Sequence, residues 1–398
     1  MKNFPFFLIL LACLVLTNCQ NDNSSNESSE TSEAKTAKFV ANPIKIEKRD
    51  VPTLGIGEAA PDFSLPGVDG QFYSLSDFES SKVFCIIFTC NHCPTAQAYE
   101  ERMVQIRKDY RAEDLALIAI SPNSEISLLD EECGYTDMRD SYEEMGWRAE
   151  HRGFDFPYLY DGDDHAVSLQ YGPVATPHAF VFDAERKLAY VGRLDASEKP
   201  GSANAEDLRM AIDALLNGEA VAEPTTKTFG CSVKWSWKDE WKQKVDEEWT
   251  AKEVSLESID EAGIKNLLAN DSEKLRLVNI WATWCGPCVM EYPEFIRIHR
   301  MFYGRDFEFV SITADDLKKQ EKALEFLKKS ESAVNNYIFD GKDKYSMIEA
   351  VDPEWNGALP YTVLVEPGGK VVYSTQGTID PLELKRTIVE HEMIGRYY

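Results

Sequence analysis

Two cysteines in the second half of the chain have a spacing that suits redox chemistry. Cys285 and Cys288 are separated by Gly-Pro, after an apolar run at 277–281 and before apolar residues at helical spacing. The pair is therefore predicted at the junction of a strand and a helix. The backbone amides of the first helical turn carry a partial positive charge, which stabilises a thiolate at Cys285. Cys288 lies one turn further on, close enough to resolve a mixed disulfide.

A second pair, Cys90 and Cys93, follows the same plan in the first half. The apolar run 83–89 is typical of a buried strand, and an amphipathic helix is predicted from 95 to about 111. Between the cysteines stand Asn and His92. A protonated or hydrogen-bonding His92 would stabilise the reduced form and make this pair the better oxidant. A solvated histidine of no consequence is the alternative.

Metal or haem binding suits neither pair. A four-cysteine zinc site usually brings its two pairs within about 20 residues of each other, and Cys93 and Cys285 are much further apart. Haem attachment needs a histidine directly after the second cysteine, whereas Pro94 and Val289 follow here. A stable structural disulfide remains the alternative to a redox centre. No cofactor and no metal are predicted.

The elements that must position these cysteines repeat along the chain. Thr176-Pro177 and Leu359-Pro360 each open an apolar strand, and lysine and tyrosine follow at equal distances from the two prolines. This repeat predicts an α/β protein with two copies of one fold in tandem, each a central mixed sheet flanked by helices. The acidic segment 130–140 is expected to be a surface loop.

The composition divides the chain into five predicted segments. These are a signal peptide (1–18), a disordered tether (19–50), a first domain (51–222), a Trp-rich connector that contains Cys231 (223–250) and a second domain (251–398). The four tryptophans of the connector are expected to pack on one or both domains, and a partner-binding surface is the alternative.

The second half resembles a known family. WCGPC followed by Glu291 and Pro293 is similar to the membrane-anchored, thioredoxin-like thiol-disulfide oxidoreductases of bacteria, the TlpA/ResA type. The resemblance implies a thioredoxin-like fold in which Glu291 is a buried carboxylate that helps tune the pair. It also implies that Pro360 is cis and faces the cysteines, so that the residue before it offers backbone hydrogen bonds to a substrate. Trp284 is expected to shield the disulfide, with a merely packed aromatic as the alternative.

The first half resembles another branch of the same superfamily. Its opening APDF motif, FTCNHCP and the closing TKTFGCSVKW are similar to peroxiredoxin-like redoxin domains, related to AhpC/TSA. The resemblance implies that Pro177 is also cis. Cys231, within the closing motif, becomes a candidate third thiol that could return to Cys90 or Cys93. A buried, unpaired cysteine is the alternative.

A peroxidase is the alternative activity for the first half. Peroxiredoxins carry a Pro-x-x-x-Thr-x-x-Cys signature and a later arginine that stabilises the thiolate and the peroxide. Cys93-Pro94-Thr95 echoes the end of this signature, but no proline precedes it within 83–89, and His178 stands near the expected arginine. Disulfide exchange is therefore preferred.

The N-terminal sequence predicts the cellular localisation of the protein. Lys2 precedes a short apolar run (4–16), which is typical of a secretory signal and too short to span a membrane. The following Leu-Thr-Asn-Cys19 resembles a bacterial lipobox, with Cys19 as the residue that becomes diacylated. Cys13 or an ordinary signal peptide is the alternative. The polar tract after Cys19 cannot bury enough surface to fold. We expect a protein of the bacterial cell envelope, on the periplasmic side, lipid-anchored at Cys19 and outside the reducing cytosol.

A formal net charge of −26 over 398 residues argues against nucleic acid as a partner. The sequence predicts a membrane-anchored thiol-disulfide oxidoreductase with two CxxC centres. Its expected partners are disulfides of exported proteins or a small thiol substrate, and a membrane reductant that donates electrons. One alternative is a thiol-dependent peroxidase regenerated by the second domain. The other is a redox-inert scaffold that binds substrates.

Overall fold

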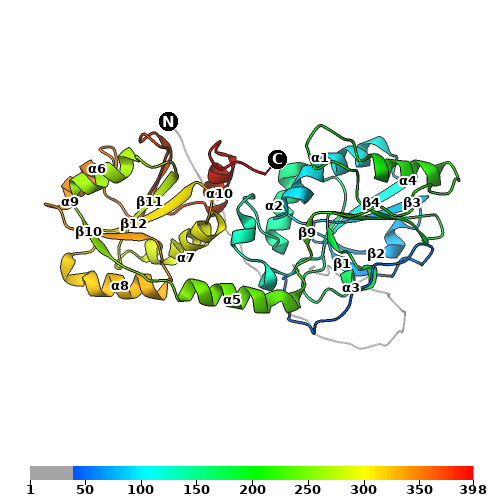
Figure 1. Ribbon diagram of the computed structural model, residues 1–398, viewed down its shortest axis with the longest axis horizontal. Coiled ribbons are helices and arrows are strands. Elements are labelled where there is room, and N and C mark those ends of the chain that lie inside the picture. The colour runs from blue at the N-terminus through cyan, green and yellow to red at the C-terminus, as the bar shows by residue number, and fades with distance from the viewer. Residues whose placement is uncertain (1–38, 398) are drawn as a thin grey trace, which may run out of the picture. The chain divides into compact units, whose positions relative to one another are not determined.

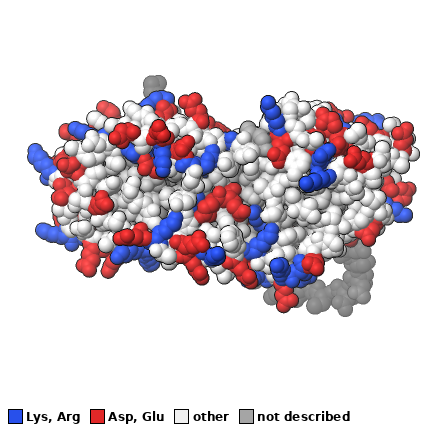
Figure 2. Space-filling model, viewed as in Figure 1, with Lys and Arg blue, Asp and Glu red and all other residues white. Residues whose placement is uncertain are grey.

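The computed structural model describes residues 39–397 (Figure 1). The predicted signal segment, Cys19 and the first part of the predicted tether therefore lie outside the described residues. Within residues 39–397, no helix is both long and apolar enough to cross a membrane. The face shown in Figure 2 carries acidic and basic side chains intermixed.

The first half of the described chain forms a five-stranded mixed sheet. Its strands, in spatial order, are β5 (Tyr158–Tyr160), β4 (Leu115–Ser121), β3 (Val83–Phe88), β7 (His178–Phe182) and β8 (Leu188–Gly192). Strands β3, β4 and β5 pair in parallel, whereas β7 and β8 are antiparallel to their neighbours. Every residue of β3 is buried, as its continuous apolar sequence predicts for a strand covered on both faces.

Alternate residues of β3 supply two separate cores. Val83, Cys85 and Ile87 pack with residues of α1 (Pro94–Asp109), α2 (Tyr142–Arg152) and α4 (Glu206–Leu216). Phe84, Ile86 and Phe88 face the other side, towards β1 (Ser64–Pro66) and α3 (Ser168–Tyr171). The short strand β2 (Phe72–Ser74) pairs with β1. The face of β3 that carries Val83, Cys85 and Ile87 therefore holds α1, which follows the first cysteine pair, against the sheet.

The second half forms a six-stranded mixed sheet. Its spatial order is β10 (Glu257–Ile259), β13 (Asn335–Phe339), β12 (Phe307–Thr313), β11 (Leu275–Trp281), β14 (Tyr361–Val365) and β15 (Val371–Gln376). One core lies between this sheet and α7 (Gly286–Met301), α8 (Gln320–Lys329) and α10 (Pro381–Glu390). The core on the other face includes residues of α6 (Glu261–Ala269) and α9 (Lys344–Val351).

The two sheets share one topology around the strand that leads to each cysteine pair. Strand β3 pairs in parallel with β4 and antiparallel with β7, which follows Pro177. Strand β11 pairs in parallel with β12 and antiparallel with β14, which follows Pro360. The prediction of two copies of one α/β fold is confirmed. Both prolines follow cis peptide bonds, as the family resemblance implied.

The segment between the two halves is ordered along most of its length. It contains β9 (Cys231–Ser232), a 3-10 turn at Ser236–Lys238 and helix α5 (Asp239–Thr250). The rings of Trp235 and Trp237 stack at 5.1 Å between centroids, and Trp249 is buried. Trp241 is the exception, with 58% of its surface exposed. The expectation that the connector tryptophans are packed therefore describes most of these rings.

The acidic segment 130–140 is not a surface loop. It includes a 3-10 turn at Glu131–Cys133, and Asp137 and Asp140 are completely buried. Sequence reasoning missed this because acidic residues are almost never buried unless they are paired. The pairing partners lie far away in the sequence, so composition alone could not reveal them.

Asp137 is paired with arginines from both halves of the chain. Its carboxylate accepts hydrogen bonds from Arg396 at 2.8 Å and Arg386 at 3.0 Å, and Arg148 lies at 3.5 Å. Burial alone would raise the pKa of Asp137, but the charges and hydrogen bonds of the arginines lower it to about 2. A buried carboxylate with these partners fixes the segment 130–140 to α10 and to the C-terminal residues.

Replacing Asp137 by Asn should lower the free energy of unfolding at pH 7 by roughly 2 kcal/mol or more, because it removes the buried carboxylate that pairs with the partly buried Arg386 and Arg396. The folded-state pKa lies below that of an unfolded aspartate, about 3.9. The stabilisation is therefore complete above about pH 4 and is lost as the pH falls through about 2. Urea unfolding of both proteins between pH 7 and pH 2 measures the difference.

The matched control is Glu113→Gln, which removes a carboxylate from an exposed pair with Arg111. It should cost less than about 1 kcal/mol. Equal effects of the two substitutions would contradict the assignment of Asp137 as a buried tie between the two halves.

Candidate active sites

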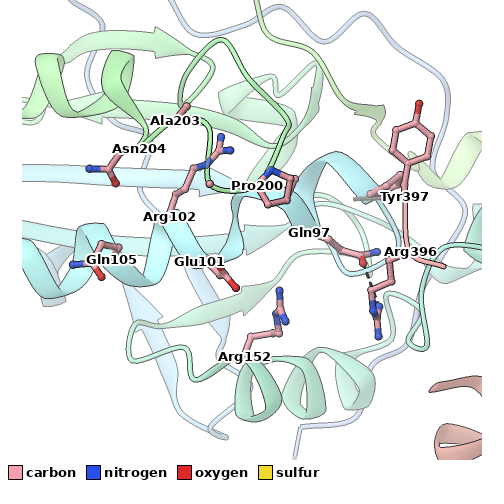
Figure 3. Close-up of a pocket in the computed structure, with 13 residues that line it drawn as sticks. Gln97, Glu101, Arg102, Gln105, Arg152, Pro200, Ala203, Asn204, Arg396 and Tyr397 are labelled. Atoms are coloured by element: carbon pink, nitrogen blue, oxygen red, sulfur yellow. Dashed lines mark hydrogen bonds between the residues drawn. The ribbon is translucent and has the colours of Figure 1, made fainter. Parts of the chain in front are cut away.

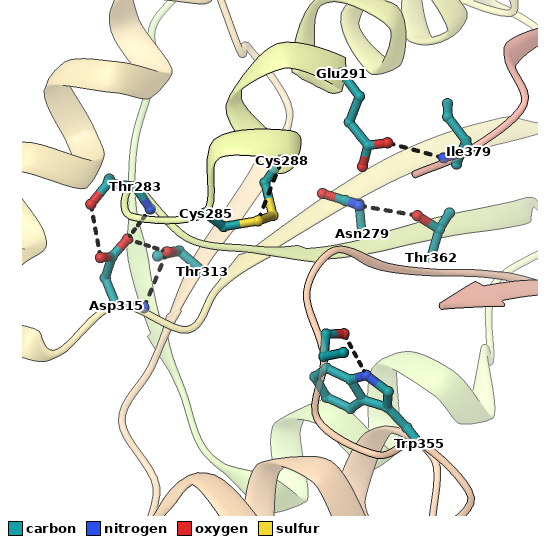
Figure 4. Close-up of a disulfide and its surroundings, with 11 residues drawn as sticks. Asn279, Thr283, Cys285, Cys288, Glu291, Thr313, Asp315, Trp355, Thr362 and Ile379 are labelled. Atoms are coloured by element: carbon teal, nitrogen blue, oxygen red, sulfur yellow. Dashed lines mark hydrogen bonds between the residues drawn. A yellow bond between two sulfur atoms is a disulfide. The ribbon is translucent and has the colours of Figure 1, made fainter. Parts of the chain in front are cut away.

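Cys285 and Cys288 lie where α7 begins. Strand β11 ends at Trp281, and Cys285 is the N-cap residue of α7, so its sulfur accepts the backbone N–H of Cys288 at 3.3 Å. The two cysteines form a disulfide (Figure 4). Cys285 is 6% exposed and Cys288 is 1% exposed. The sulfur at the helix N-terminus is therefore the more accessible of the two.

Glu291 lies one turn after Cys288 on the same helix (Figure 4). It is 9% exposed, and Oε2 accepts the backbone N–H of Ile379 at 3.0 Å. Its other oxygen is buried and has no hydrogen-bond partner among the described residues. Burial raises the pKa of Glu291 to about 7. The carboxyl group can therefore gain or lose a proton near neutral pH.

Pro360 and Trp284 occupy different positions relative to the disulfide. Leu359, which precedes Pro360, packs against the core cluster that includes Cys285 and Cys288. Trp284 directly precedes Cys285 and is 54% exposed. Trp284 is therefore not a buried core residue, although Nζ of Lys344 lies 5.5 Å from the centre of its ring. Its exposed ring stands at the rim of the site, where shielding of the disulfide stays a prediction.

The first cysteine pair has a different register on its helix. Strand β3 ends at Phe88, and Cys93 is the N-cap residue of α1, with its sulfur 3.5 Å from the backbone nitrogen of Ala96. In the second half the first cysteine of the pair holds this position, whereas here the second one does. Cys93, not Cys90, is therefore the positional counterpart of Cys285. The expectation that the two pairs follow the same plan is corrected in this respect.

His92 is buried in an ion pair. Its Nδ1 lies 2.6 Å from Oδ2 of Asp140, and both side chains are at most 2% exposed. Asp140 also accepts the backbone N–H groups of Asn91 and His92, and the side-chain amide of Asn123. Burial lowers the pKa of His92, but the charge and hydrogen bond of Asp140 outweigh it, so the net shift is upward. The interpretation of His92 as a solvated side chain is wrong.

The cysteine thiols of the first half differ in their ionisation. Burial raises the pKa of Cys93, but hydrogen bonds from the thiols of Cys231 and Cys90 and the charge of His92 outweigh it and lower the pKa well below its usual value. Burial is the main reason why the pKa of Cys90 is well above its usual value. The arrangement therefore favours a thiolate at Cys93 and a protonated thiol at Cys90.

Thr176, which precedes Pro177, touches both cysteines. Its hydroxyl lies 3.1 Å from Sγ of Cys90, and its carbonyl oxygen lies 3.3 Å from Sγ of Cys93. Cys231 joins the group from the connector, with its backbone N–H donated to Sγ of Cys93 at 3.4 Å. The structure therefore brings together every site residue predicted for the first half.

Among the described residues, one group offers metal-ligand atoms at close range. Atoms of Cys90, His92 and Asp140 lie within 4.8 Å of one another. Both oxygens of Asp140 already accept two hydrogen bonds each, from His92, Asn91 and Asn123. Ligation would require Asp140 to give up some of these bonds. The residues therefore fit a carboxylate that supports His92 better than a metal ligand. Asp140 is the main residue that sequence reasoning missed.

A cavity of about 510 Å³ lies beside α1 (Figure 3). Three arginines reach it, but each is already paired: Arg102 with Asp195, Arg152 with Glu100, and Arg396 with Asp137. Neither Cys90 nor Cys93 lines the cavity. Because its cations are neutralised, the cavity has no evident preference for an anion and we assign it no role.

Comparison with known proteins relates each half to a described family. Residues 56–191 match the AhpC/TSA family model, and residues 248–388 match the Redoxin model. The thiol-disulfide oxidoreductase ResA of Oceanobacillus iheyensis is 26% identical over 143 residues, which cover 33% of this chain and 64% of that protein. ResA of Bacillus subtilis is 27% identical over 107 residues, covering 26% and 52%. The chain thus spans about half to two thirds of the length of these curated relatives.

Solved structures also match the chain. A hypothetical protein from Sinorhizobium meliloti 1021 is 32% identical with a TM-score of 0.41, covering 46% of this chain and 96% of that one. An uncharacterised conserved protein from Geobacillus kaustophilus is 35% identical with a TM-score of 0.40, covering 48% and 95%. The two family models, the ResA relatives and the repeated topology lead to one conclusion. The chain consists of two thioredoxin-superfamily domains in tandem, of which the first contains the match to the AhpC/TSA model and the second the match to the Redoxin model.

Proposed function

We propose that this protein is a thiol-disulfide oxidoreductase whose principal centre is Cys285 and Cys288. The observation that carries the proposal is the position of the pair, with Cys285 at the N-cap of α7 and Cys288 one turn further on. The partial positive charge of the helix N-terminus favours the thiolate form of Cys285. Two curated relatives that match part of this chain are themselves named thiol-disulfide oxidoreductases.

The proposed reaction is a pair of exchanges at sulfur. The Cys285 thiolate attacks one sulfur of a substrate disulfide and releases the other as a thiolate. Cys288 then loses its proton and attacks Cys285, which releases the second substrate thiolate and closes the protein disulfide. The substrate gains two electrons, and the protein dithiol loses them.

Three neighbouring residues have proposed supporting roles. Glu291 takes up the proton that Cys288 loses, because its pKa of about 7 suits a group that exchanges protons near neutral pH. Leu359, before Pro360, offers its backbone to an extended substrate. Trp284 covers one side of the docking position, since its ring is exposed beside Cys285.

The first domain supplies a second proposed centre. The Asn-His pair of Cys90 and Cys93 favours the oxidising end of the potential range, whereas a Gly-Pro pair favours the reducing end. The buried ion pair of His92 and Asp140 supports this assignment, because a positive imidazolium stabilises the thiolate at Cys93. We therefore expect the dithiol of Cys285 and Cys288 to reduce the first centre.

The proposed setting is the bacterial cell envelope. The sequence before Cys19 supports a lipid anchor at that residue, with disulfides of exported proteins or a small disulfide as substrates. A membrane reductant would then supply electrons. No nucleic acid is expected among the partners, given the formal net charge of −26.

A thiol-dependent peroxidase is the second candidate, and the placement of Cys93 favours it. A buried thiolate at the N-terminus of α1 suits attack on a small peroxide. When the peroxiredoxin signature is aligned on Cys93, however, Cys90 replaces its threonine and Ile86 its proline. A hydrogen peroxide consumption assay with Cys93→Ser as the inactive control decides between the two candidates.

We expect Cys285→Ser to abolish the reduction of insulin disulfides by the dithiothreitol-reduced protein, because it removes the attacking thiolate. Cys288→Ser should instead accumulate a mixed disulfide between Cys285 and the substrate, visible by intact-mass spectrometry. Cys133→Ala is the matched control, because Cys133 is buried outside both centres. Undiminished activity after all four CxxC cysteines become Ser would favour the scaffold hypothesis instead.

Glu291→Gln should change how stability depends on pH. The folded-state pKa of about 7 lies above the value of about 4.3 in an unfolded chain. Wild-type stability therefore falls as the pH rises from about 4 to about 7, whereas the glutamine variant lacks this loss. In urea unfolding of the oxidised proteins, the variant should gain on the order of 2 kcal/mol relative to wild type between pH 4 and pH 8.

The same variant should reduce insulin more slowly at pH 7, because an amide cannot take up the proton of Cys288. Glutamine keeps an oxygen that can accept the N–H of Ile379, so the local fold is preserved. Glu294→Gln, on the same helix but partly exposed, is the control. It should leave both the pH dependence of stability and the rate of insulin reduction unchanged. If the free energy of unfolding changed with pH in the same way in wild type and in Glu291→Gln, the assigned role would be contradicted.

A further inference from the structure

The first centre is covered by a segment of its own chain. Cys90 is 2% exposed and Cys93 is not exposed at all. Strand β9 (Cys231–Ser232) pairs antiparallel with β6 (Ala175–Thr176), which directly precedes Pro177. In the second domain the corresponding residue, Leu359, takes part in no strand pair within residues 39–397.

The register of this pairing brings Cys231 to the reactive sulfur. Thr176 is the direct partner of Cys231, and the backbone N–H of Cys231 reaches Sγ of Cys93 at 3.4 Å. The side chain of Cys231 also packs against the buried cluster that contains Cys90 and Cys93. An extended peptide that adds a strand next to Thr176 would present its own cysteine in this way. The connector thus occupies the position that a substrate peptide would need.

The segment is fastened on both sides of Cys231. Gly230 has a φ of +134°, and a Cβ atom at this position would lie 2.1 Å from the carbonyl oxygen of Thr176. Only glycine allows the two strands to approach so closely. On the other side, the backbone N–H of Lys234 is donated to Oδ1 of Asn123 at 2.9 Å, and its carbonyl oxygen accepts the backbone N–H of Ser124 at 2.9 Å. The backbone N–H of Ser236 is donated to Nε2 of His165 at 2.8 Å. The covering strand is therefore a fixed part of the domain.

We propose that residues 229–233 are a built-in substrate strand of the first centre and that Cys231 is the disulfide partner of Cys93. This inference rests on the proposed function as an oxidoreductase. It implies that the first domain does not accept polypeptide disulfides. Its substrates are the small disulfides, or the second domain's cysteines, that can reach Cys231.

The exposure of the three thiols sets the order of the steps. Cys231 is only partly buried, whereas Cys90 and Cys93 are buried. The Cys93 thiolate raises the pKa of the Cys231 thiol, so in oxidation Cys231 first gives its proton to Cys93. The Cys231 thiolate then attacks a small disulfide and becomes a mixed disulfide, and the small thiolate that leaves takes the proton from Cys93. The Cys93 thiolate then attacks Cys231 and expels the second small thiolate, which takes a proton from solvent. Two protein thiols are oxidised, and one small disulfide is reduced to two thiols.

Reduction follows the same path in reverse. A thiolate such as Cys285 attacks the sulfur of Cys231 in the Cys93–Cys231 disulfide and expels Cys93. A low-pKa thiol is a good leaving group, and Cys93 is the thiol with the lowered pKa. Cys288 then attacks Cys285 and releases Cys231. The disulfide has moved to Cys285 and Cys288, and the first centre holds both electrons.

Disulfide mapping of the full chain tests the proposal directly. The reduced protein is equilibrated with a graded series of reduced and oxidised glutathione, free thiols are alkylated, and peptides are identified by mass spectrometry. We expect a Cys93–Cys231 crosslink as the main disulfide of the first domain, absent from Cys231→Ser. A Cys90–Cys93 disulfide with Cys231 free would overturn the proposal. So would a stoichiometric metal ion in the purified protein that Cys231→Ser removes.

The Cys285 and Cys288 pair is read in the same samples, which separates the two hypotheses. If this pair titrates and the Cys93–Cys231 crosslink never forms, the built-in strand is wrong and the proposed oxidoreductase stands. If the crosslink forms while Cys285 and Cys288 stay locked as a disulfide, the proposed principal centre is wrong instead.

A second variant tests whether the strand controls access. Gly230→Ala places a methyl group against the Thr176 carbonyl and should displace the strand, so that iodoacetamide labels Cys90 and Cys93 about tenfold faster or more. Gly218→Ala is the matched control, since its φ is also positive, at +74°, but no atom lies within 4 Å of the added Cβ. An unchanged labelling rate in Gly230→Ala, with far-ultraviolet circular dichroism preserved in both variants, would overturn the covering role.

Discussion

Both cysteine centres depend on a sulfur atom that caps a long helix. The first backbone N–H groups of a helix have no partners within it, and the sulfurs of Cys93 and Cys285 accept one of them at the start of α1 and α7. This contact holds each sulfur in the positive field of the helix N-terminus. The helix cap therefore determines which cysteine is the reactive one. The order of the two cysteines within the CxxC motif does not determine it. Phe88 and Ile280 each pair with the residue that follows a cis proline, and in both domains the cap lies five residues further on. The loops therefore match, and the CxxC motif of the first domain is placed three residues earlier.

What separates the two centres is the surface above the cap. In the second domain, Cys285 keeps some exposure beside the exposed ring of Trp284, and no strand pairs with Leu359 within the described residues. In the first domain, β9 covers the equivalent edge and adds a third thiol. A shared fold therefore provides an open docking edge in one copy and a closed one in the other. Low-dielectric burial also makes the His92 and Asp140 pair matter more to Cys93 than a surface pair would.

The parts of this structure that sequence could predict are those with a local signal. Continuous apolar runs identified β3 and β11, the cysteine spacing identified the helix starts, and resemblance supplied the buried Glu291 and the cis prolines. Asp140 could not be found in this way, because its partner His92 is 48 residues away and the segment 130–140 has neither helical nor strand periodicity. Which cysteine caps each helix also escaped prediction, because it depends on how the strand before the motif pairs with the strand after a cis proline far away in the sequence.

The buried segment 130–140 connects the residues that support the two cysteine centres. Asp140 holds His92 beside Cys93, and three residues earlier Asp137 holds Arg386 of α10. At the other end of this contact path, Ile379 stands just before α10 and donates its N–H to Glu291. A shift of α10 would separate the charges of Asp137 and Arg386 in a buried place, where an unpaired charge is strongly destabilising. The pair of Asp137 and Arg386 therefore resists independent movement of Asp140, which holds His92, and of Ile379, which contacts Glu291.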